Sequence, residues 1–191
     1  MTTLTLDHHR PAGALIGLGA WGVSAGALLQ LVLGIPLASF EAQDPPAAAI
    51  VALNILSHVL LATGMVGLLR SEAAGPVRLA VAGPSITLLG LAVLIVAEGS
   101  WLVGLSASDT LYMSATFALF LGLTLTGVMV LKARRWTSWH RFTPLACGLF
   151  IPLVVLPSFA LPGLAMNYAL GLWGVCWLLL GVSLHTQAEA R

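Results

Sequence analysis

The chain has 191 residues, of which 59% are apolar and only 8% are charged, and its formal net charge is +1. Soluble domains carry about 25% charged residues, so this composition excludes a water-covered globular surface and makes lipid the solvent for most of the chain. A nucleic-acid binder is excluded because so small a net charge offers no phosphate-binding face. Cys147 and Cys176 both lie in apolar runs, which excludes a disulfide scaffold and a thiolate metal site.

Long uncharged stretches predict the membrane spans. A transmembrane helix needs about 20 predominantly apolar residues. The last uncharged stretch, residues 142–188, is long enough for two helices, and the segment from Pro157 to Gly163 supplies the turn signal between them. We therefore predict an all-α fold, a single six-helix transmembrane domain over residues 1–191, with helices at about 11–39, 46–69, 79–103, 110–132, 142–159 and 162–185.

The third helix has two candidate starting points. It begins either at Leu79 or at Pro84, and we favour Pro84 because proline suits the first turn of a helix and because the apolar run continues through Trp101 to Val103. From a start at Pro84, Glu98 lies more than one turn inside the outer boundary. From Leu79, Glu98 is the outer end of the helix.

The basic residues predict the orientation of the bundle. With six helices, all eight Lys and Arg residues fall at one end, whereas Glu41, Asp44, Glu98 and Asp109 fall toward the other. The positive-inside rule then places both termini in the cytoplasm. The first apolar stretch is too long for a cleaved signal peptide and is read as a retained helix. The predicted location is the cytoplasmic (inner) membrane of a bacterium.

Two helices carry faces of small residues. They are Gly13, Gly17, Ala20, Ser24 and Ala27 on the first helix, and Gly163, Asn167, Gly171, Gly174 and Gly181 on the last. Small residues let helices approach closely in lipid, and their usual use is packing within one chain. The alternative is that one face docks a membrane protein partner or a second copy, so that the chain is a non-catalytic subunit or a homo-oligomer.

Several polar residues are predicted to lie at membrane depth, where polar groups are costly and are candidates for function. They are Gln30, Asn54, His58, Glu98, Asn167 and Tyr168. Together with Tyr112, all lie in the outer half or near the midplane, and Trp101 and Tyr112 are also interpreted as interfacial anchors. We expect a cavity open to the outer face, floored by His58 with Glu98 at its rim, that binds a small or lipophilic ligand or exchanges protons. The alternative is that these groups only hydrogen-bond across helices.

Catalytic and cofactor motifs do not stand out. The sequence has no nucleophile-and-base pattern and no His-Glu-x-x-His motif, so it favours a non-enzyme and assigns no catalytic or metal residue. The cofactor stays unknown. His140 and His185 come to the same cytoplasmic level, which leaves a haem- or quinone-binding anchor as a further alternative to ordinary boundary residues.

The chain combines six helices with short loops in 191 residues, two cytoplasmic ends and a small-residue face on the first helix. In these features it resembles the substrate-binding subunits of energy-coupling-factor vitamin transporters. The resemblance lies in architecture and size, with no shared motif, and it implies a carrier or a ligand-binding subunit.

Overall fold

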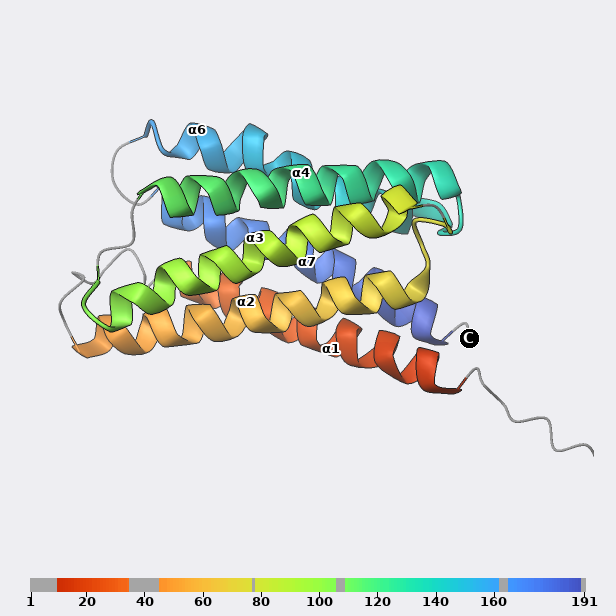
Figure 1. The fold of residues 1–191 in the computed structure, drawn as a ribbon, viewed down its shortest axis with the longest axis horizontal. Helices are drawn as coiled ribbons and strands as arrows, with labels where there is room; N and C mark the ends of the chain where they lie inside the picture. Colours follow the sequence, from red (N-terminus) through yellow and green to blue (C-terminus); the bar gives the residue numbers. More distant parts are fainter. Residues whose placement is uncertain (1–9, 35–44, 77, 106–108, 162–164, 190–191) are drawn as a thin grey trace, which may run out of the picture.

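The computed structural model describes residues 10–34, 45–76, 78–105, 109–161 and 165–189, and within these ranges it contains helices and no strands. The long helices are α1 (Arg10–Leu33), α2 (Pro45–Ser71), α3 (Arg78–Leu102), α4 (Asp109–Ala133) and α7 (Ala165–Glu189). With the composite fifth segment, Ser138–Ser158, six segments are long and apolar enough to span a membrane, which confirms the predicted count (Figure 1).

The fifth segment is assembled from shorter pieces. A 3-10 turn (Ser138–Phe142) leads into α5 (Thr143–Phe150), a π-helical segment (η3, Ile151–Val155) and a last turn, α6 (Leu156–Ser158). Pro144 suits the start of α5. Pro152 and Pro157 lack the backbone N–H that a regular helix would use. Pro152 lies inside the π-helical segment, and Pro157 lies in the turn that follows it.

One backbone carbonyl in this segment receives a side chain from α7 instead of a helical partner. The N–H of Ile151 donates to Gly148, and Pro152 has no N–H to donate. The carbonyl of Cys147 accepts a hydrogen bond from Nε1 of Trp173 at 2.8 Å. The irregular helix therefore fixes the orientation of a large aromatic side chain on α7.

The six segments form a closed ring. Each packs against the next along the chain, and α7 packs against α1 to complete the circle. Successive segments run in opposite directions, so the starts of α2, α4 and α7 lie at one end, whereas the start of α1 and the end of α7 lie at the other (Figure 1). We call these the loop end and the terminal end.

The small-residue faces pack inside the ring. Gly171, Gly174 and Gly181 on α7 lie against α1, where a Cβ added at Gly174 would come within 2.7 Å of the carbonyl oxygen of Ala27. On α1, Ala20 and Ala27 are fully buried, whereas Gly13 and Gly17 have open space beside them. Gly163 and the side chain of Asn167 lie outside the described residues. Where the structure describes these faces, internal packing uses most of them.

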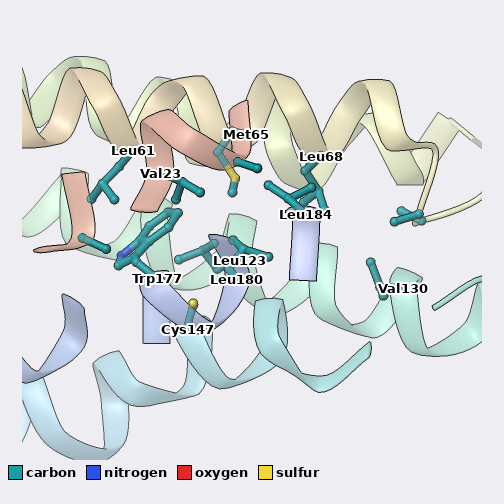
Figure 2. Close-up of a cluster of buried hydrophobic side chains, with 14 of the residues drawn as sticks. Val23, Leu61, Met65, Leu68, Leu123, Val130, Cys147, Trp177, Leu180 and Leu184 are labelled. Carbon is teal, nitrogen blue, oxygen red and sulfur yellow. The ribbon is translucent and has the colours of Figure 1, made fainter. Parts of the chain in front are cut away.

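The terminal half of the ring is filled by apolar side chains. Its buried cluster includes Leu61, Met65, Leu68, Leu123, Val130, Leu180 and Leu184 (Figure 2). Val23, Cys147 and Trp177 belong to the same cluster (Figure 2).

The favoured start of the third helix is wrong. Helix α3 begins at Arg78 and carries Pro84 inside it, so the start at Leu79 is correct to within one residue. Glu98 nevertheless lies four residues before the end of the helix at Leu102, or about 6 Å of rise. The expected helix ends at 35–39 and 162–164 lie outside the described residues.

Candidate functional site

A cavity of about 410 Å³ occupies the loop half of the ring, and all six segments contribute to its wall. On each segment the lining residues follow helical spacing, for example Val51, Asn54 and His58 on α2. Steps of three and four residues place side chains on one face of a helix. The cavity is therefore formed by the inner faces of the helices.

The polar floor of the cavity is a three-residue cluster. Asn54 Nδ2 donates a hydrogen bond to Glu98 Oε1 at 2.6 Å, and His58 Nδ1 lies 3.1 Å from Glu98 Oε2. The side chains of His58 and Glu98 are only 4% and 8% exposed. Asn54 and His58 are one turn apart on α2, so together they hold both carboxylate oxygens of one residue on α3.

Gln30 is the polar group that α1 contributes to the cavity wall. Gln30 is 5% exposed, and its Oε1 has no hydrogen-bond partner among the described residues. Buried polar atoms are normally paired, so an orphan acceptor in a cavity wall requires a physical reason. A ligand that donates a hydrogen bond would supply one.

Aromatic rings form a large part of the wall. Four of them line the cavity: Trp101 on α3, Tyr112 on α4, Phe159 directly after α6, and Trp173 on α7. Trp101 and Tyr112 were expected to be interfacial anchors, and the structure places both against the cavity. The indole of Trp173 is held by its hydrogen bond to Cys147, so this part of the wall is fixed by the backbone of the neighbouring segment.

The charges around the cavity are unbalanced. Its described lining contains the carboxylates of Glu98 and Asp109 and no Lys or Arg. Asp109 begins α4 and is exposed at the loop end. About two turns farther along the same face of α4, the hydroxyl of Thr116 donates a hydrogen bond to the backbone carbonyl of Tyr112 at 2.8 Å. Only His58 supplies a basic side chain to the described lining.

The structure gathers four of the six predicted site residues. Gln30, Asn54, His58 and Glu98 line one cavity. Tyr168 is 45% exposed and is not among the lining residues. Asn167 belongs to the first turn of α7, but its side chain lies outside the described residues.

Sequence reasoning missed most of the apolar wall, including Trp173 and the π-helical residues Ile151 and Val155. For the part of the wall on α4, the signal available was the spacing of the lining residues. Asp109, Tyr112, Thr116 and Leu119 follow steps of three and four, and a face that joins a carboxylate, a phenol and a hydroxyl is unusual for a helix surrounded by lipid.

The two histidines of the haem alternative have other neighbours. His140 Nδ1 lies 3.1 Å from the hydroxyl of Ser183, and the His185 ring packs edge-on against Trp21 with centroids 4.9 Å apart. Within the described part of the chain no three His, Cys, Asp or Glu residues are placed to hold a metal ion. The haem- or quinone-binding alternative stays a prediction.

No protein-family model matches the chain, and no curated protein or solved structure is significantly similar to it. The resemblance to vitamin-transporter subunits therefore remains one of architecture and size.

Proposed function

We propose that the chain is an integral membrane protein that binds a small, partly apolar ligand in the cavity of its loop half. The observation that carries the proposal is the hydrogen-bonded cluster of Asn54, His58 and Glu98, which lines an internal cavity. Ionisable groups at membrane depth are costly and typically mark a binding site or an ion pathway. Cavities of a few hundred cubic ångströms with apolar walls and a few polar groups are the usual form of ligand sites.

The outer surface of the ring supports insertion into a bilayer. Large apolar side chains point outward along the segments, among them Leu18, Trp21, Leu89, Val96 and Phe117, each more than 60% exposed. Monomeric soluble proteins rarely expose continuous apolar surface of this extent. A lipid environment is the setting in which this surface is stable.

The distribution of charge supports an opening on the non-cytoplasmic side. Arg70, Arg78, Lys132, Arg134 and Arg141 all lie at or next to helix boundaries of the terminal end. By the positive-inside rule this end faces the cytoplasm. The cavity lies in the opposite half, so a ligand would enter from outside the cell or from the outer leaflet.

Native mass spectrometry of the protein, extracted in mild detergent, tests for a bound ligand. We expect a discrete additional mass on the wild-type chain. Val51→Trp should remove this mass, because Val51 lines the cavity and an indole at this position would fill part of it. The matched control is Val59→Trp on the same helix, because Val59 is 45% exposed and does not line the cavity.

The two variants also separate loss of binding from loss of folding. If both variants retain the added mass, the ligand lies outside the cavity and the proposal is wrong. A second outcome would also contradict the proposal. In it, wild-type protein extracted from its native membrane carries no added mass and gains none when it is incubated with small amphipathic compounds.

A further inference from the structure

We infer that the ligand of this cavity carries a protonated amine, and that Glu98 and Gln30 receive its N–H groups. This inference rests on the proposed function and adds the chemical class of the ligand. It follows from three properties of the lining: unused acceptors, an excess of negative charge, and aromatic walls.

Two residues of the cavity lining, Gln30 and Glu98, carry hydrogen-bond acceptors with capacity that the described residues leave unused. Gln30 Oε1 is buried and has no partner in the described structure. Each oxygen of Glu98 has one protein partner, Asn54 or His58, whereas an ionised carboxylate can accept about four hydrogen bonds in total. A primary ammonium carries three N–H donors and no acceptor, which complements a set of free acceptors.

Two hydrogen-bond donors of the wall are already engaged. The hydroxyl of Thr116 donates to the carbonyl of Tyr112, and the indole of Trp173 donates to the carbonyl of Cys147. These two donors are not free for a ligand carboxylate or phosphate, and the carboxylates of Glu98 and Asp109 in the same lining would repel an anion. A neutral hydroxyl would fit the acceptors with fewer hydrogen bonds than an ammonium.

The charge of the lining also favours a positively charged ligand. Two carboxylates, Glu98 and Asp109, face the cavity, and within the described lining only His58 can balance them. Charges act over longer distances in an apolar interior than in water. The more exposed Asp109 would attract a cation toward the opening, and the buried Glu98 would hold it.

The aromatic wall suits the remainder of such a ligand. Trp101, Tyr112 and Trp173 present rings to the cavity, and rings attract cations through their negative faces. They also provide apolar surface for a hydrocarbon or aromatic tail. The geometry thus points to an amphipathic amine, with its ammonium at Glu98 and its apolar part against the rings.

Three probes of one skeleton test the inference: 4-phenylbutylamine, 4-phenylbutanol and 4-phenylbutyrate. They share size and tail and differ in the charge of the head group. Binding to the detergent-solubilised full chain is measured by equilibrium dialysis at neutral pH, with Val51→Trp as the background for partition into micelles. We expect the amine to bind at least about tenfold more tightly than the alcohol, since hydrogen bonds to charged groups are the stronger ones, and the carboxylate not to saturate.

Two substitutions assign the preference to named groups. Glu98→Gln keeps the size of the side chain and removes the charge, so the ratio of amine to alcohol affinity should fall toward one. Gln30→Leu should weaken the amine severalfold and leave more of the preference intact. Binding of 4-phenylbutanol to both variants shows that the cavity is still folded.

The outcomes separate this inference from the proposed function. Equal affinity for amine and alcohol, or tighter binding of the carboxylate, would overturn the amine assignment and leave a ligand cavity in place. Failure of all three probes to bind above the Val51→Trp background would count against both. An amine preference that survives Glu98→Gln unchanged would refute the assigned role of Glu98.

Discussion

Glu98 on α3 and His58 on α2 form a buried pair, with 3.1 Å between Oε2 and Nδ1 and less than a tenth of either side chain exposed. The pair connects two neighbouring helices in the loop half, where the interior is not filled by apolar side chains. Removing two ionisable groups from water costs nearly as much as their attraction returns. Retaining such a pair beside a cavity therefore suits a ligand site better than it suits simple stabilisation.

His58→Leu should destabilise the bundle strongly. It removes the partner of Glu98 Oε2 and leaves a buried carboxylate with Asn54 alone. Breaking a buried pair from one side costs about 3–5 kcal/mol. The free energy of unfolding in mixed detergent micelles, followed by tryptophan fluorescence, measures this loss. The double variant His58→Leu/Glu98→Leu should lose less than the sum of the two single variants, and strict additivity would show that the two groups do not interact.

Gln30→Leu and Asn54→Leu should change stability in opposite directions. Both replace an amide in the cavity wall by a side chain of similar size. Gln30 Oε1 has no described partner, so its removal should raise the free energy of unfolding by about 1 kcal/mol. Asn54 donates to Glu98, and its removal should lower stability by about 1.5–3 kcal/mol. Thermal midpoints of the two variants without added ligand decide the matter, and a loss in both would show that Gln30 has a partner.

The sequence predicts the number of helices and the polar floor because both depend on strong local signals. Charges at the helix ends mark the spans, and polar residues stand out in apolar runs. The same reasoning places the third helix too late, since Pro84 suits a first turn yet lies inside α3. Trp173 was missed because an apolar aromatic residue in lipid carries no signal. Its place in the wall depends on the hydrogen bond that its indole donates to the carbonyl of Cys147. That carbonyl is available because Ile151 bonds to Gly148 and Pro152 has no N–H, and Trp173 reaches it only in the folded chain.

Glu72→Gln should have little effect on stability. Glu72 pairs with Arg135 at 3.1 Å at the terminal end, but their side chains are 66% and 44% exposed. Exposed ion pairs contribute about 0–1 kcal/mol and are weakened by salt. Unfolding of Glu72→Gln and wild type at low and high salt should differ by less than 1 kcal/mol. A loss as large as that of His58→Leu would contradict the distinction between the buried and the exposed pair.

Reporter fusions should place the two ends of the ring on opposite sides of the membrane. Green fluorescent protein fused after Arg191 should fluoresce, because the basic residues of the terminal end predict a cytoplasmic location. Alkaline phosphatase fused after Leu105, between α3 and α4, should be active, because the loop end then faces outward. Exchanging the two reporters should abolish both signals. Activity of the exchanged pair would invert the bundle and turn the cavity toward the cytoplasm.

Gly19→Ala should destabilise the chain, whereas Gly17→Ala should not. A Cβ added at Gly19 would lie 2.7 Å from the Cα of Gly67 and 2.8 Å from the carbonyl oxygen of Thr63, so α1 and α2 would have to separate. Beside Gly17, two residues away on the same helix, nothing lies within 4 Å. Close backbone approach is the main source of helix association in lipid, and forcing it apart should cost about 1–3 kcal/mol. Alanine at Gly17 should be neutral or slightly favourable, because it is the better helix former. Equal unfolding midpoints for the two variants would show that α1 and α2 do not make this contact, whereas a loss at Gly17 alone would point to a partner helix on the open side of α1.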